Sequence, residues 1–242
     1  MKYTKKINKK ILTGDEKLFS EKDWLPYTKL WGEKQVLTSP LFERAFNLIL
    51  EKHKVKRKTM FISQCTSTRP YYLSPKWAKF KEDFGNLTDL VVLSNAGVIP
   101  ESFWCSYPFL NYNSGRNRRT TNDKDIKRLY IQLDTKLYNK KTYEKVKKFL
   151  KKHSYSYVVA NFSFKSVNYL PINKALFELK KEDFIKDYVV IPDKKTYLEA
   201  KATNWQGLDM GYFYRSIYPD LSYVINQKLT KFVNLWGNNN ES

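Results

Sequence analysis

Apolar positions in the first half of the chain alternate between helical and strand-like spacing. After Ser39, which suits a helix N-cap, and Pro40, which suits the first helical position, apolar residues recur with the period of an amphipathic helix. The short run Thr59–Gln64 is rich in strand formers, and a second Ser-Pro pair at Ser74 begins another helical pattern. This region therefore predicts helix, strand, loop and helix in that order.

Three further apolar runs predict strands in the rest of the chain. Residues 88–97 are continuously apolar enough for a strand covered on both faces, and residues 155–164 and 186–192 give two more candidates. Residues 123–153 carry helical periodicity in two pieces. A last helical pattern covers residues 211–236 and is broken near a proline.

Strands that alternate with helices predict an α/β fold, a three-layer sandwich with a mostly parallel central sheet. We expect a basic N-terminal extension over residues 1–36, the core domain over 37–195, and a C-terminal helical segment with a frayed tail over 196–242. In such sheets, ligands bind beyond the carboxyl ends of the strands. The loops that begin "CTSTRPYY", "SNAGVIP" and "NFSFKS" are therefore expected to face one rim.

Charge narrows the choice of partner. The 242 residues include 44 Lys and Arg against 24 Asp and Glu, which gives a formal net charge of +20. This balance favours a polyanion, with nucleic acid as the leading candidate, although the codon bias of an A/T-rich genome also enriches lysine. The sequence shows neither a secretory apolar block nor an apolar run of membrane-spanning length, so we expect a soluble cytoplasmic protein without a membrane partner.

Three segments resemble a known family in their order and spacing. The segments "SQCTSTRPYYLSPKW", "LVVLSNAGVIPESFWCSYPFLNYN" and "YSYVVANFSF" are similar to the core domain of archaeosine synthases, which are archaeal proteins related to tRNA-guanine transglycosylases. The resemblance covers roughly residues 59 to 164. It implies a layout like that of uracil-DNA glycosylases. It also implies a reaction in which a nitrogen nucleophile, with lysine as the donor, adds to the nitrile of 7-cyano-7-deazaguanine in tRNA.

The resemblance can be carried over position by position, and it has three departures. Matching positions are Cys65, Pro70, Tyr71, Ser74, Gly97, Val98, Pro100, Tyr107, Pro108 and Tyr112. Arg69 stands in place of the family lysine, Trp77 in place of a histidine, and Asn113 in place of an aspartate. Arginine stays protonated and asparagine cannot act as a base, so these changes leave open whether the family's reaction survives.

Cys65 and Arg69 are the candidate catalytic residues. A thiolate attacks a nitrile to give a thioimidate, which an amine can then resolve, and a neighbouring cation such as Arg69 favours the thiolate. The alternative for Cys65 is a small buried residue at a strand end. The second cysteine lies forty positions further on, and the pair forms neither a disulfide framework nor a zinc pattern.

Candidate binding residues surround this pair in the sequence. Tyr71 could stack on a base, whereas Tyr72 is interpreted as loop packing. Asn95 could read a base edge or bond its own backbone, and Gly97 serves the turn. The remaining substrate-binding candidates are Ser74, Tyr107, Tyr112 and Asn113, and a basic loop with Arg116, Arg118, Arg119 and Lys124 suits phosphate.

These patterns leave three functions open. The first is a base-modifying enzyme or subunit that acts on a 7-deazaguanine-type base in tRNA rather than DNA, with a partner chain as one source of a substrate-docking domain. The second is a non-catalytic nucleic-acid binder that keeps the pocket. The third is a glycosylase-like enzyme, which rests on fold analogy alone. No cofactor or metal is expected, and His53 and His153 are interpreted as helix-end residues.

Overall fold

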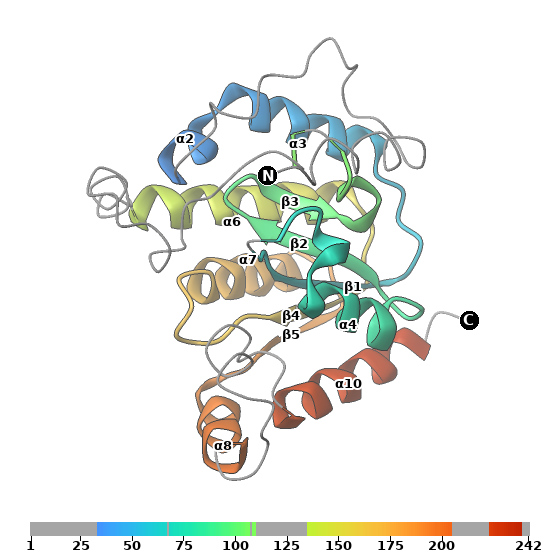
Figure 1. Ribbon diagram of the computed structural model, residues 1–242. Helices are drawn as coiled ribbons and strands as arrows, with labels where there is room; N and C mark the ends of the chain where they lie inside the picture. The colour runs from blue at the N-terminus through green and yellow to red at the C-terminus, as the bar shows by residue number, and fades with distance from the viewer. Residues whose placement is uncertain (1–32, 67, 107, 110–134, 205–222, 239–242) are drawn as a thin grey trace, which may run out of the picture.

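The computed structural model describes residues 33–66, 68–106, 108–109, 135–204 and 223–238 (Figure 1). Five strands of this part of the chain form a sheet in the order β3-β2-β1-β4-β5. The strands are β1 (Thr59–Gln64), β2 (Asp89–Ser94), β3 (Gly97–Pro100), β4 (Tyr157–Asn161) and β5 (Asp187–Ile191). All neighbouring pairs are parallel except β2 and β3. The predicted α/β fold with a mostly parallel sheet is confirmed.

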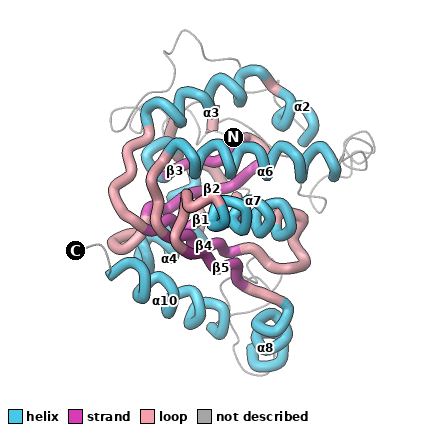
Figure 2. The backbone as a smooth tube through the Cα atoms, turned by 180° about the vertical axis from the view of Figure 1, so that it is seen from behind, coloured by secondary structure: helices cyan, strands magenta, loops and turns pink. Residues whose placement is uncertain are grey.

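Helices cover both faces of this sheet. Figure 1 shows α4 (Pro75–Phe84) and α10 (Tyr223–Gly237) in front of it. Figure 2 shows α3 (Pro40–Lys52), α6 (Thr135–Lys152) and α7 (Tyr169–Lys181) on the opposite face. Short helices complete the described elements: α2 (Glu33–Thr38), η3 (Tyr71–Leu73), η4 (Glu101–Phe103) and α8 (Lys194–Asn204).

Contacts from β1 and β4 show which residues face the α4 and α10 layer. The ring of Phe61 lies 4.8 Å from that of Phe80, and Tyr157 stacks on Trp236 at 5.3 Å. Side chains alternate along a strand. Ser63 in β1 and Asn161 in β4 therefore face the same helical layer as these aromatic rings.

The predicted strand over residues 88–97 is wrong at its carboxyl end. β2 ends at Ser94, a turn follows at Asn95 and Ala96, and Gly97 begins the antiparallel strand β3. Gly97 has a φ of 127°, which L side chains rarely adopt. The segment "SNAGVIP" is therefore a hairpin rather than an open loop, because a polar Asn-Ala turn reverses the chain within two residues.

The connections define a switch point in the middle of the sheet. Helix α4 links β1 to β2 on one face, whereas α6 and α7 lead into β4 and β5 on the other (Figures 1 and 2). The order of the strands therefore reverses between β1 and β4, where Ser63 pairs with Asn161. In open α/β sheets, the crevice outside the carboxyl ends of the strands at such a point is the common ligand position.

Candidate functional site

The carboxyl ends of three parallel strands meet at one edge of the sheet. In the register of the sheet, Gln64 pairs with Leu93 and Ser63 pairs with Asn161. The segments that follow β1, β2 and β4 therefore start side by side, as the sequence predicts. We call this side of the sheet the carboxyl edge.

Cys65 lies at the carboxyl edge with a free, half-buried thiol. Its backbone N–H donates to the carbonyl of Leu93 at 2.9 Å, so the residue continues the line of β1. Lys76 is 2 % exposed, and its Nζ donates to the carbonyl of Gln64, the residue before Cys65, at 3.3 Å. A buried ammonium group therefore lies beside the backbone that carries the cysteine.

Lys76 is a functional candidate that sequence reasoning missed. It lies in the first turn of α4, where the helix dipole favours an acidic residue and disfavours a cation. Its Nζ also lies 5.6 Å from the centre of the Phe80 ring, so a buried amine stands close to the end of β1. The lysine after a Ser-Pro helix start was the signal in the sequence.

Arg69 makes contacts within the loop that follows β1. Its Nη1 donates to the carbonyl oxygens of Thr66 and Thr68, and its guanidinium carbon lies 4.3 Å from the centre of the Tyr71 ring. These contacts position the loop, and the catalytic role of Arg69 stays a prediction.

The two adjacent tyrosines differ in their exposure to solvent. Tyr71 is 0 % exposed, and its ring makes edge contacts with Trp77 at 6.5 Å and Trp104 at 6.0 Å. The ring packs against its aromatic neighbours, and base stacking by Tyr71 stays a prediction. Tyr72 is 36 % exposed on the surface of the same turn. Trp77 is itself buried among aromatic rings, with Phe80 at 5.6 Å.

Buried polar groups without hydrogen-bond partners gather at the carboxyl edge. Asn161 is 0 % exposed, and neither its Oδ1 nor its Nδ2 has a partner. The Oγ of Ser74, the Nδ2 of Asn95 and the Nε1 of Trp77 are also buried and unpartnered. Ser74 stands at the N-cap of α4 as predicted, yet its side chain makes no capping bond. Each such group costs about 1–3 kcal/mol, so the cluster is suited to a ligand that supplies the missing partners.

Asn161 was also missed by sequence reasoning. Its backbone carbonyl accepts a bond from the Oγ of Ser63 at 3.3 Å, which fixes the end of β4 against β1 at the switch point. The amide side chain offers one acceptor and two donors to a planar partner. The polar residue that ends the apolar run "YVVAN" was the available signal.

Gly97 lies at the same end of the sheet, close to an ion pair between the buried Lys145 and the half-buried Glu43. A Cβ at Gly97 would meet the Cδ of Lys145 at 3.5 Å. The Nζ of Lys145 lies 2.9 Å from the Oε1 of Glu43, which links α6 to α3. Burial lowers the pKa of Lys145, and the bond to Glu43 partly offsets this effect. The Lys145 side chain of this ion pair therefore packs against the hairpin at Gly97.

The rest of the predicted site lies outside the described residues. This holds for Tyr107, Tyr112 and Asn113, and for the basic loop with Arg116, Arg118, Arg119 and Lys124. Their roles remain predictions.

A second buried polar cluster lies at the opposite edge of the sheet, which we call the amino edge. The Nε2 of His53 lies 2.7 Å from the Oη of Tyr155, which donates to Asp89 Oδ2 at 3.0 Å. The ring of His153 lies 4.8 Å from that of His53. Burial lowers the pKa of both histidines to about 4, helped by nearby positive charge. Burial also raises the pKa of Asp89.

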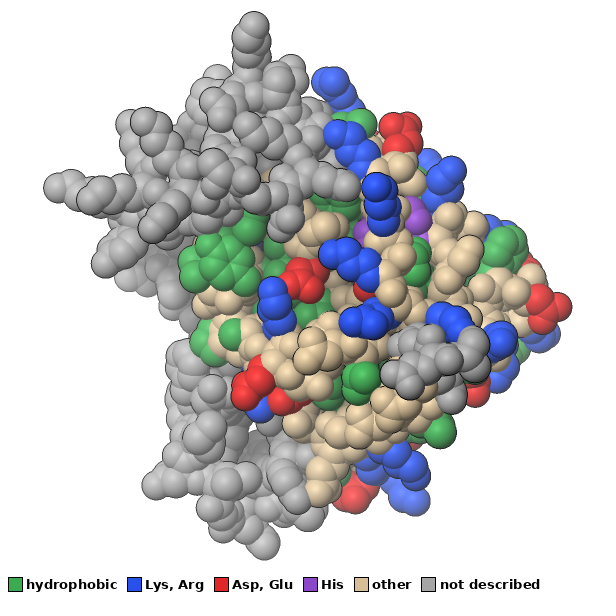
Figure 3. All heavy atoms as spheres, turned by 90° about the vertical axis from the view of Figure 1, so that its right-hand side faces the viewer, with side chains coloured by type: hydrophobic (Ala, Val, Ile, Leu, Met, Phe, Trp, Pro, Cys, Tyr) green, Lys and Arg blue, Asp and Glu red, His purple; other side chains and the backbone are tan. Residues whose placement is uncertain are grey.

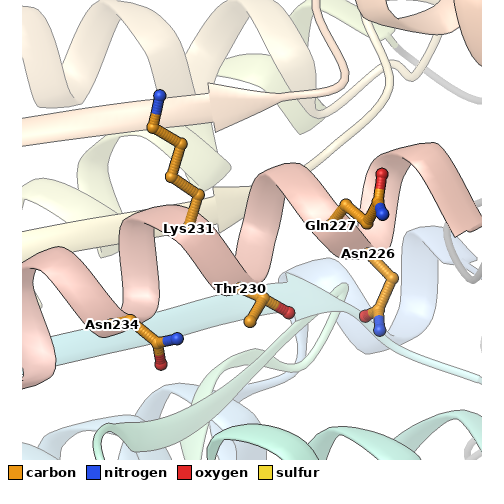
Figure 4. Close-up of a pocket in the computed structure, with 5 residues that line it drawn as sticks. All are labelled: Asn226, Gln227, Thr230, Lys231 and Asn234. Carbon is orange, nitrogen blue, oxygen red and sulfur yellow. The ribbon is translucent and has the colours of Figure 1, made fainter.

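An open polar hollow lies along α10 (Figure 4). Its lining comes from successive turns of that helix: Asn226, Gln227, Thr230, Lys231 and Asn234. Figure 4 shows these side chains pointing in two directions rather than converging on one point. We therefore place the candidate site at the carboxyl edge.

Comparison with known proteins adds little to this geometry. No protein family matches the chain, and no curated protein matches it. A solved structure that it resembles is AF0587, described as a protein of unknown function, with 16% identity and a TM-score of 0.38. The match covers 62% of this chain and 43% of that one. A TM-score this low supports no inference about the fold or the function of this chain.

In the described part of the chain, no helix is long and apolar enough to cross a membrane. Among the same residues, no group of three or more His, Cys, Asp or Glu side chains is placed to hold a metal ion.

Proposed function

We propose that this chain modifies a 7-deazaguanine-type base in nucleic acid, in tRNA rather than DNA, by adding a nitrogen nucleophile to a nitrile. One observation carries the proposal: a free thiol and a cluster of unpartnered polar groups lie at the same edge of the sheet, beside its switch point. The motif resemblance supplies the identity of the base and of the reaction. A cytoplasmic location and a partner chain that docks the substrate belong to the same proposal.

The thiol of Cys65 suits the first step of this reaction. The sulfur forms a bond to the nitrile carbon, and the thiol proton passes to the nitrile nitrogen, which gives a thioimidate. An amine then attacks the same carbon, the carbon–sulfur bond breaks, and the thiol is restored with a proton from the amine. Lys76 contributes positive charge beside the cysteine backbone, where negative charge develops on the nitrile nitrogen.

Asn161, Ser74 and Asn95 suit the binding of the base. A deazaguanine presents neighbouring donors and acceptors on its edge, and an amide side chain with both groups unpartnered can satisfy one of each. Ser74 adds a hydroxyl that can donate or accept. Binding would then remove the cost of leaving these groups unpaired in the free protein.

The proposal is tested with the purified full chain. We expect tRNA that carries 7-cyano-7-deazaguanine to gain the mass of the amine donor when lysine is supplied, with or without cell extract. The Cys65→Ser variant should lose turnover by at least a hundredfold and keep its affinity for the tRNA, because serine preserves the size of the side chain. Absence of both binding and turnover in the wild-type protein would refute the proposal.

A second candidate function is recognition of the base without chemistry. Two observations favour it. The guanidinium of Arg69 donates to a carbonyl of its own loop, and Trp77, which stands where the family has a histidine, is buried. This function predicts that Cys65→Ser changes neither binding nor any product, so the same experiment separates the two candidates.

A further inference from the structure

Three basic segments from distant parts of the chain meet at the amino edge of the sheet. The loop between α3 and β1 pairs with the segment before β4, where Ser156 N–H donates to the carbonyl of Lys58 at 2.8 Å. The segment before β5 joins them, because Lys186 N–H donates to the carbonyl of Ser156 at 2.8 Å. The exposed cations that this arrangement assembles are Lys54, Lys56, Arg57, Lys152 and Lys186, and we call them the basic edge.

The basic edge is visible in Figure 3. The histidine side chains in purple mark the amino edge, and Lys and Arg side chains in blue are spread around them. Taken alone, each of the three segments is an ordinary helix end or loop. The fold instead places them on a common surface.

Within the described residues, the cations of the basic edge form no close ion pair with a carboxylate. By contrast, Lys151 lies 2.6 Å from Glu182, and Lys180 lies 2.7 Å from Asp187. The half-buried Asp89 attracts Lys56 electrostatically, but its carboxylate accepts bonds from the backbone N–H of Lys56 and from Tyr155 and so holds the loop.

The basic edge is also held in place by buried contacts. The bond between His53 and Tyr155 ties the end of α3 to the segment before β4, and the rings of His53 and Phe149 stack at 5.5 Å. Fixed positive charges that repel one another raise the free energy of the folded chain, and a polyanion would relieve that cost. The backbone that carries these side chains is ordered before binding, so its conformational entropy is not lost when a ligand arrives.

We propose that the basic edge is a docking surface for the phosphate backbone of nucleic acid. Lysine and arginine that replace the counterions of a phosphate backbone gain affinity from counterion release, without reading the sequence. The surface is separate from the carboxyl edge, so the proposal does not depend on the chemistry assigned to Cys65. A strand of five or six residues is about 17–20 Å long, and a folded nucleic acid is large enough to reach both edges.

The test compares two triple variants of equal net charge. In one, Lys54, Arg57 and Lys152 are changed to Gln. In the matched control, Lys140, Lys174 and Lys231 are changed to Gln, which are exposed lysines on the outer faces of helices. The affinity of each full-length protein for an unmodified, fluorescently labelled tRNA transcript is measured by anisotropy between 50 and 300 mM salt, roughly the range in which phosphate contacts weaken.

We expect the basic-edge variant to lose affinity by about tenfold or more at 0.1 M salt, and its salt slope to fall by about 2 to 3. The control variant should bind within about threefold of the wild-type protein. Equal losses in the two variants would overturn the proposal, since they would show that only net charge matters. It would also be overturned by a wild-type protein that binds vesicles of anionic phospholipid but no tRNA.

Discussion

At the scale of single residues, the structure separates packing from candidate function at positions that look equivalent in the sequence. Tyr71 and Tyr72 are neighbours of the same type, yet one is fully buried and the other is 36 % exposed. Successive side chains of a tight turn point in different directions, and the packing of Trp77 and Trp104 against the turn decides which of them is covered. The sequence places Cys65 directly after a predicted strand, as the structure does, but it does not show which of the two tyrosines is exposed.

This difference predicts opposite effects for two substitutions. We expect Tyr71→Ala to lower the free energy of unfolding by about 3–5 kcal/mol, because it removes a buried aromatic ring. Tyr72→Ala should change it by less than about 0.5 kcal/mol. Urea denaturation followed by tryptophan fluorescence measures both values. Similar losses in the two variants would contradict the burial that the structure shows.

Asn161 allows a sharper prediction, because its side chain is buried without partners. We expect Asn161→Leu to raise the free energy of unfolding by about 1–2 kcal/mol, since an unpaired amide is replaced by an apolar group of similar size. The same variant should lose binding of the base. Stabilisation together with lost binding is the expected property of a site residue.

Asn168 is the matched control. It is also buried, but its Oδ1 accepts a hydrogen bond from the Oη of Tyr138. We therefore expect Asn168→Leu to destabilise the chain by about 1–3 kcal/mol. If both asparagines give the same sign in urea denaturation, the amide of Asn161 is not unpaired in solution.

At the scale of elements, the ends of α3 and α6 meet through the two histidines, which are the only ones in the chain. The pKa of each is lowered to about 4 by burial. A histidine in the unfolded chain has a pKa of about 6.5. As the pH falls below 6.5, the unfolded state therefore takes up protons first. The stability that these residues contribute is present above pH 6.5 and is lost as the pH falls to 4.

We predict a loss of about 1–3 kcal/mol in the free energy of unfolding between pH 7 and pH 4.5, since His53 is only partly buried. The double variant His53→Gln/His153→Phe should show a flatter profile over that range. The Asp89 carboxyl acts in the opposite direction, because its pKa is raised, but it is present in both proteins. Thermal or urea unfolding at a series of pH values tests this, and parallel profiles would contradict it.

Helices and strands were predictable where the sequence carries a clear helix-start signal or a short apolar run. The Ser-Pro pair at Ser39 gives the first residue of α3, and the run Thr59–Gln64 gives β1 with the bounds that the structure has. The hairpin of β2 and β3 was not predictable from apolar character, because the run continues through Gly97 as in a longer strand. Helix α7 was also missed, since the exposed Leu170 and Phe177 obscure its apolar face.

At the scale of the whole molecule, the two edges of the sheet carry different properties. The carboxyl edge holds the free thiol and the unpaired polar groups, and the amino edge holds the exposed cations. The sequence predicts the first arrangement because parallel strands end together. It does not predict the second, because residues about a hundred positions apart become neighbours only through the order of the strands.

This arrangement predicts a dependence on the size of the substrate. We expect the basic-edge triple variant to raise the KM for modified tRNA by about tenfold and to leave kcat unchanged, since the cations act in docking rather than in the reaction. With the free nucleoside as substrate, the same variant should match the wild-type protein. A lower kcat with both substrates would show instead that the amino edge influences the reacting site.

The central claim is that the chain changes a 7-deazaguanine-type base at the carboxyl edge through Cys65. Mass spectrometry of nucleosides from the tRNA and DNA of cells with the gene, without it, and with only the Cys65→Ser form tests this claim most directly. We predict a modified deazaguanine in tRNA that disappears without the gene and is not restored by the serine form. Identical nucleoside profiles in all three kinds of cell would contradict it.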